Sequence, residues 1–150
     1  MGLMTTVSSL LKGASVTLDD YQLGTLSFNG EYWTLEEHVD NHYVDVGLEG
    51  DRNGPYYYPR SLWLKISDHA DRLWADAKSY FVNQLIKEQK KPADWQPSDA
   101  EFRLFSINVM QEQSFLGGEL LFHFELVNDP YANYVVVFRG EFPFAWHRDE

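Results

Sequence analysis

One long stretch of the chain repeats its apolar residues at helical spacing. Between residues 67 and 91 these side chains recur every three or four positions, which places them on one face of a helix. The stripe consists of Ala70, Leu73, Trp74, Ala77, Phe81 and Leu85. Ser67 or Asp68 can cap the first turn, and Pro92 stops the run. The pattern therefore predicts one long central helix over residues 67–91.

Alternating apolar and polar residues predict strands before this helix. Residues 23–28 and 31–36 flank Asn29-Gly30, a dipeptide that favours a type I′ hairpin turn with positive φ at both residues. Residues 42–48 alternate as a half-buried strand. The polar segment 49–54 is expected to be a loop.

The segment Ser61–Ile66 fits two structures. Alternation would put Leu62, Leu64 and Ile66 on one side of a strand. Leu62 and Ile66 would also extend the helical stripe upstream. The strand is favoured, because Ser67 and Asp68 form a better helix cap than any residue before them.

Three more strands are expected after the helix, at residues 102–110, 115–127 and 133–142. In the first of them, Phe105, Ile107 and Val109 are expected to share one side. Gly117-Gly118 indicates a bend or a bulge. Residues 1–15, with a helical turn at 8–12, and residues 143–150 are expected to be loosely ordered.

The order of strands, helix and strands is typical of an α+β domain. A mainly antiparallel sheet, made from both ends of the chain, is expected to pack on the central helix. The chain has 150 residues, which fits a single domain. An exposed edge strand of this sheet could pair with a second copy of the chain and form a homodimer.

The net charge of the chain limits the classes of molecule that it is expected to bind. It has 12 basic and 23 acidic residues, for a net charge of −11, and residues 16–60 contain nine acids and two bases. Such a field repels nucleic acid and anionic membranes and attracts basic proteins. There is no cysteine, which excludes disulfides and cysteine-based zinc sites. No segment has the pattern of a signal peptide or a membrane span, so the cytoplasm is the expected location.

One segment carries metal-ligand residue types. In His38-x-Asp40-x-His42, residues two apart would share a face if the segment were an extended strand, with Glu36 one step further along. Two histidines and a carboxylate can bind iron or zinc. Three ligands from one strand make poor geometry, however, and a solvated polar segment is the favoured interpretation. A metal-dependent enzyme at this triad therefore stays the third hypothesis, and no cofactor is predicted.

Other catalytic signals are absent from the sequence. It contains no phosphate-binding loop, no dinucleotide fingerprint, no nucleophile elbow and no H-E-x-x-H zinc motif. His123 is expected on the less apolar side of a strand, between Glu119 and Glu125, but no spacing ties a nucleophile to it. The balance favours a protein that is not an enzyme.

The residues Tyr56-Tyr57-Tyr58-Pro59-Arg60 are typical of a binding surface. Tyrosine offers a large rigid contact area at little entropic cost, and arginine pairs with carboxylates or stacks on rings. The alternative is a strand start whose tyrosines pack across the sheet. Nearby acids would steer a basic partner. The predicted binding residues are Glu36, Glu37, Asp40, Asp45, Asp51, Tyr56, Tyr57 and Arg60.

A resemblance favours the same class of function. Trp95, the segment Asp99–Phe102, the segment Phe105–Ile107 and the closing strand Tyr134–Phe138 are similar to their counterparts in small uncharacterised bacterial domains. The resemblance covers about the last two thirds of the chain. Several acidic domains of this build are immunity proteins, which bind and block a toxin. The resemblance implies a binding protein rather than an enzyme; together with the acidic charge and the tyrosine run, this leads us to expect a domain that occludes a basic toxin, such as a nuclease. A small-ligand or sugar binder, with an aromatic-lined pocket between helix and sheet, is the second hypothesis.

Overall fold

The computed structural model describes residues 16–112 and 117–149, and its fold is α+β. The expected helical turn at residues 8–12 lies outside the described residues. The strands are β2 (Val16–Asp20), β3 (Gly24–Phe28), β4 (Tyr32–Val39), β5 (His42–Asp51), β6 (Gly54–Pro55), β7 (Phe102–Glu112), β8 (Gly117–Leu126), β9 (Asp129–Arg139) and β10 (Phe142–Asp149). The helices are α1 (Tyr57–Ile66), η1 (Ser67–His69), α2 (Ala70–Lys87) and η2 (Asp99–Glu101).

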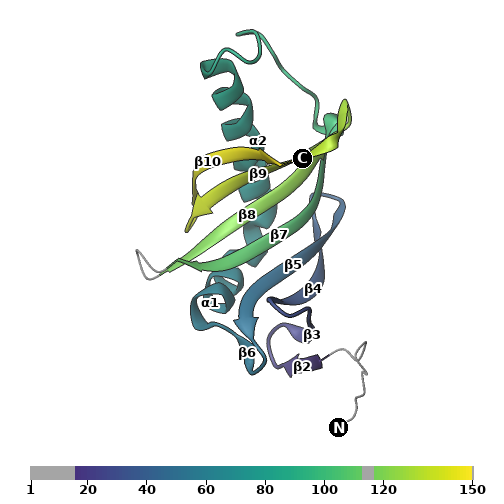
Figure 1. The fold of residues 1–150 in the computed structure, drawn as a ribbon, viewed down its shortest axis with the longest axis vertical. Helices are drawn as coiled ribbons and strands as arrows, with labels where there is room; N and C mark the ends of the chain where they lie inside the picture. The colour runs from purple at the N-terminus through teal and green to yellow at the C-terminus, as the bar shows by residue number, and fades with distance from the viewer. Residues whose placement is uncertain (1–15, 113–116, 150) are drawn as a thin grey trace.

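The described strands form one sheet in the order β10-β9-β8-β7-β5-β4-β3-β2, with β6 paired to β5. All neighbours are antiparallel except β5 and β7, which are parallel. A parallel pair needs a long crossover, and here the crossover contains α1 and α2. Both helices therefore lie on one face of the sheet (Figure 1). The predicted sheet from both ends of the chain, packed on a central helix, is confirmed.

The helical region starts earlier and ends earlier than predicted. Ser61–Ile66 is helical and belongs to α1, so the favoured strand was wrong. Leu62, Trp63 and Ile66 are buried, and this burial outweighs the missing side-chain cap at Tyr56. Pro59 lies in the first turn of α1, where its lack of an N–H costs nothing.

A short 3-10 segment, η1, separates α1 from α2 at the predicted cap. Neither Ser67 nor Asp68 makes a capping bond there. Helix α2 ends at Lys87 rather than at residue 91. Gln89 adopts a positive φ of 61°, and the N–H groups of Lys90 and Lys91 then donate to the carbonyl of Leu85. This turn reverses the chain before Pro92 is reached.

Two predicted irregular segments are strands. β5 continues to Asp51 and turns into β6, so most of segment 49–54 is sheet rather than loop. Residues 142–149 form the eight-residue edge strand β10, which pairs with β9 except at a register shift between Pro143 and Ala145. Trp146 on β10 packs against the ring of Phe81, with 5.5 Å between ring centroids. The pairing with β9 and this contact hold residues 143–149 against the rest of the fold.

The hairpin turns differ from their predicted geometry. A turn follows β3 at Asn29-Gly30, but only Gly30 has a positive φ, and the Asn29 side chain accepts the N–H groups of Glu31 and Tyr32 instead. Among the described turns, positive φ at two successive residues occurs at Asp40 and Asn41, between β4 and β5. That is the backbone pattern of a type I′ turn.

Strand β7 changes face at a bulge. Its register with β8 shifts between Leu104 and Ser106, and Leu104 and Ile107 are both in the core. Phe105 therefore lies on the other face from Ile107 and Val109, contrary to the predicted alternation. Gly118 is not at a bulge: it lies in β8 where Leu62 crosses, and a Cβ there would come within 2.7 Å of the Leu62 side chain.

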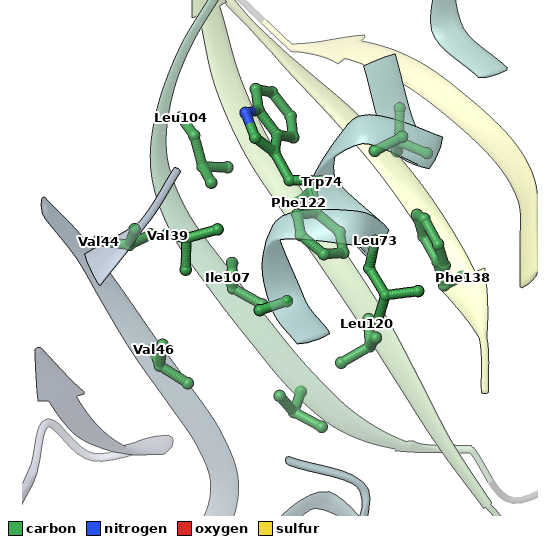
Figure 2. Packing of buried hydrophobic residues seen from close by; sticks show 14 of the residues in the cluster. Val39, Val44, Val46, Leu73, Trp74, Leu104, Ile107, Leu120, Phe122 and Phe138 are labelled. Atoms are coloured by element: carbon green, nitrogen blue, oxygen red, sulfur yellow. The ribbon is translucent and has the colours of Figure 1, made fainter. Parts of the chain in front are cut away.

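The core lies between the helices and one face of the sheet (Figure 2). All six predicted stripe residues of α2 are buried. Trp74 is at the centre, 6.1 Å from the ring of Phe122 and 5.4 Å from that of Phe124. Leu73 and Phe138 pack nearby. Both α1 and α2 are on this side of the sheet. The opposite face carries neither of these helices, and we call it the open face.

Candidate functional site

A single row of side chains crosses the open face from β4 to β10. Strand pairing places each member opposite the next, so the row runs Glu36, Asp45, Ser106, His123, Val135, His147. Strands are about 4.8 Å apart, which makes the row roughly 24 Å long. We call it the open-face row.

The acidic end of the open-face row forms a shallow pocket. The pocket has a volume of about 280 Å³, and its lining, the acidic pocket, consists of Glu36, Tyr43, Val44, Asp45 and Phe105. The alternation of β4 and β5 turns both carboxylates to the open face, because Leu35 and Val46 are in the core. The β7 bulge brings Phe105 to the same face.

The two carboxylates of the acidic pocket are directly opposite each other. Glu36 pairs with Asp45 across β4 and β5, which places their Cβ atoms about 5 Å apart. Both residues are exposed, and no described basic side chain forms an ion pair with either. Two like charges at this position repel and destabilise the sheet. The pair is therefore suited to a cation from outside the described chain.

An exposed aromatic side chain flanks the two acids. Tyr43 is 78% exposed, and its ring lies 4.1 Å from that of His38. Phe105 is half-buried and faces the imidazole of His123, with ring centroids 6.2 Å apart. The pocket thus offers two carboxylates for a cation and two rings for an apolar stem or a cation–π contact.

The middle of the open-face row carries a half-buried polar pair. The Nδ2 of Asn108 lies 3.3 Å from the Nε2 of His123. Burial lowers the pKa of the His123 imidazole, so this ring is neutral at pH 7. His123 lies on the less apolar side of its strand, as the alternation predicts. It adds no charge to offset the two acids.

The other predicted binding residues lie elsewhere. Glu37 is half-buried on the helix-covered face, and Asp40 is in the β4–β5 turn, 3.6 Å from the amine of Lys78. Asp51 is six residues beyond Asp45 along β5, about 20 Å away, and its carboxylate accepts the N–H of Asn53. Of the five predicted acids, the structure brings Glu36 and Asp45 together and leaves the others apart.

The tyrosine run begins helix α1 rather than a strand. Tyr56 is its half-buried N-cap, and Tyr57 is 74% exposed. Arg60 donates two bonds of 2.8 Å to the carboxylate of Asp20. Its guanidinium also lies 5.5 Å from the ring centroid of Tyr21, which is 90% exposed. Arg60 is thus already paired, and sequence reasoning missed Tyr21 because nothing in the sequence links it to a residue 39 positions away.

The His38, Asp40 and His42 side chains do not converge. His38 lies against Tyr43 on the open face, whereas His42 points to the helix side, 6.4 Å from the ring of Trp74. The type I′ turn at Asp40 separates the two histidines, so extended-strand spacing does not apply. In residues 16–112 and 117–149, no three histidine, aspartate or glutamate side chains are grouped as a metal site.

Comparison with known proteins found no protein that is similar to this chain. No family model matches the chain, and no curated protein or solved structure is significantly similar to it. Within the described residues, no helix is long and apolar enough to cross a membrane. The function of the protein must therefore be inferred from the geometry of the acidic pocket and the open-face row.

The repulsion between the two acids can be measured without a partner. Glu36→Gln removes one charge of the opposed pair, so we expect it to stabilise the fold by about 0.2–1 kcal/mol at low salt. The gain should shrink at 1 M salt, where the Debye length is about 3 Å. Asp76→Asn is the matched control, because Asp76 is exposed on α2 and has no ion pair in the described chain. Urea unfolding curves measure both; equal effects of the two variants would contradict the repulsion.

Proposed function

We propose that this protein binds a basic protein through the acidic pocket and the adjacent open-face row. The observation that carries the proposal is the opposed pair Glu36 and Asp45, exposed and without a described cation. Such a pair lowers the stability of the free chain, and a lysine or arginine of a partner would relieve the repulsion on binding. Tyr43 supplies the exposed aromatic contact that binding hot spots use.

We propose further that binding acts by occlusion, as in immunity proteins. The resemblance noted for Trp95 and the closing strands supports this class, and the net charge of −11 would speed the approach of a basic toxin domain such as a nuclease. The open-face row is roughly 24 Å long, a length comparable to the width of a standard interface patch of about 800 Å² per partner. No catalytic role for the chain is required, and its work would be done in the cytoplasm.

Capture of partners by charge-reversed variants tests the proposal. Immobilised wild-type protein should retain a basic protein from a lysate of the native host at low salt and lose it at high salt. Glu36→Lys combined with Asp45→Lys should abolish the capture, because the pocket would then repel the partner. Mass spectrometry identifies what is bound, and titration of the purified partner should show at least about tenfold weaker binding by the reversed variant.

The matched control for this experiment changes the net charge equally. Asp76→Lys with Asp94→Lys reverses two exposed acids that have no ion pair in the described chain and lie on α2 and in the loop after it. This variant should capture the partner nearly as well as the wild type. Equal losses in both double variants would show that only the overall charge matters and would contradict a site at Glu36 and Asp45.

A further inference from the structure

A second hollow lies where the end of α2 meets the β8–β9 turn and the end of β10, regions that can be followed in Figure 1. Its volume is about 400 Å³, within the range of small-molecule sites. Leu85, Tyr134 and Trp146 form its apolar wall. Lys90, Lys91 and Arg148 supply cations at its edge. This anion pocket shares no residue with the acidic pocket.

The turn after α2 places the two lysines at the anion pocket. Gln89 has a φ of 61°, a conformation that a residue with a side chain adopts at a cost and that glycine usually fills at this position. The reversal lets Lys90 and Lys91 donate their N–H groups to the Leu85 carbonyl, at 2.9 and 3.3 Å. Lys90 and Lys91 then line the pocket, because the chain no longer follows the helix axis.

The charge of the anion pocket is opposite to that of the whole chain. The Arg148 guanidinium lies 3.1 Å from the Asp129 carboxylate, which also accepts the Tyr134 hydroxyl at 2.6 Å. Lys90 and Lys91 have no carboxylate within 4 Å in the described chain, although the Lys91 amine lies 5.1 Å from the ring of Trp95. Three cationic residues and one acid line the pocket, and the Glu88 carboxylate bonded to the Trp146 indole adjoins it, which leaves a local charge of +1.

The polar groups also fix the aromatic wall. The Trp146 indole N–H donates to Glu88 at 2.9 Å, and the Trp146 ring packs edge-on against Phe81. Arg148 donates to the Tyr134 hydroxyl at 3.2 Å. Lysines near a helix end are favoured by the helix dipole alone, but the dipole does not account for a hollow with fixed aromatic walls beside them.

We propose that the anion pocket binds a small organic anion with a flat apolar body. Its carboxylate or phosphate group would pair with Lys90 and Lys91, and its body would lie against Trp146 and Leu85. A flat apolar part of the ligand is favoured because the pocket wall contains aromatic rings. A negatively charged group is favoured because the amines of Lys90 and Lys91 have no ion pair in the described chain. This site is separate from the proposed partner surface, so the two proposals can be tested independently of each other.

Titrations followed by NMR test this site. The probes are 1-naphthoate, 1-naphthyl phosphate, the neutral 1-naphthamide and inorganic phosphate, and the signal is the indole N–H of Trp146. We expect saturable shifts with the first two probes, about tenfold weaker binding of the amide, and no saturation by inorganic phosphate at the same concentrations. The stronger of the two naphthyl anions identifies which head group the pocket prefers.

Two double variants decide whether the lysines act as proposed. Lys90→Gln with Lys91→Gln should weaken 1-naphthoate about tenfold and leave 1-naphthamide unchanged. Arg52→Gln with Lys87→Gln is the charge-matched control, since both residues are exposed, lie outside the pocket and have no ion pair in the described chain. Equal binding of acid and amide, equal loss in both variants, or saturation by inorganic phosphate alone would overturn the proposal.

Discussion

Replacing Trp74 by alanine should cost about 3–5 kcal/mol of unfolding free energy, the range for deleting a large aromatic side chain from a core. The indole is fully buried between α2 and the sheet and stacks on Phe122 (Figure 2). Phe102 and Phe124 contact it edge-on. Its loss would leave a cavity that links β7, β8 and the helix, because none of these elements can move inward alone. Urea unfolding at pH 7 measures the loss.

The phenylalanine variant of the same residue should cost far less. The Nε1 of Trp74 is buried and has no hydrogen-bond partner among the described residues. Trp74→Phe removes this unsatisfied donor, which offsets part of the lost volume. Trp33→Phe is the matched comparison, because the Trp33 N–H donates to the Asp51 carbonyl at 2.7 Å. We expect Trp33→Phe to cost about 1–2 kcal/mol more than Trp74→Phe. Equal costs would show that the Trp74 N–H has an acceptor in solution.

Asp20→Asn should destabilise the protein by about 2 kcal/mol at pH 7. The Arg60 guanidinium bonded to Asp20, helped by the N–H groups of Gln22 and Leu23, lowers the pKa of this carboxyl to about 2. The Asp20 side chain is 8% exposed, so little of this interaction is screened by water. The pair joins the β2–β3 turn to the start of α1, and its loss should loosen this corner of the sheet.

The pH dependence of this effect has a definite sign. The folded pKa lies below the ordinary value of 3.8, so the unfolded chain takes up the proton first as the pH falls. The stabilisation is complete above about pH 5, is lost progressively as the pH falls through the folded pKa of about 2, and is absent below about pH 1. Unfolding curves of the wild type and Asp20→Asn should therefore converge over that interval.

Asp19→Asn is the control for the Asp20 prediction. Asp19 is the exposed neighbour on β2, and its carboxylate accepts only the Thr25 hydroxyl among the described contacts. Its replacement should change stability little at any pH between 2 and 7. A constant gap between the wild type and Asp20→Asn across this range would contradict the ion pair as the source of the effect.

The acidic pocket could be predicted only in part. The alternation of β4 and β5 places Glu36 and Asp45 on exposed faces of their strands, and sequence reasoning selected both. It also selected Glu37 and Asp51, because composition does not show which face the helices will cover. Phe105 was assigned to the wrong face, since a bulge depends on how β7 meets β8 and leaves little trace in the apolar pattern.

The sequence by itself determined the α+β class, the buried stripe of α2 and the alternating strands on both sides, because these follow from local periodicity. Only the tertiary structure decided that Ser61–Ile66 is helical, since Leu62 and Ile66 fit a strand or a helix until the sheet is there to cover them. Long-range contacts also decide three other features: the parallel pairing of β5 with β7, the pairing of β10 with β9, and the position of Phe105 in the same pocket as Glu36. Their free energy comes from burial between segments far apart in the chain, and local sequence carries no record of such pairing.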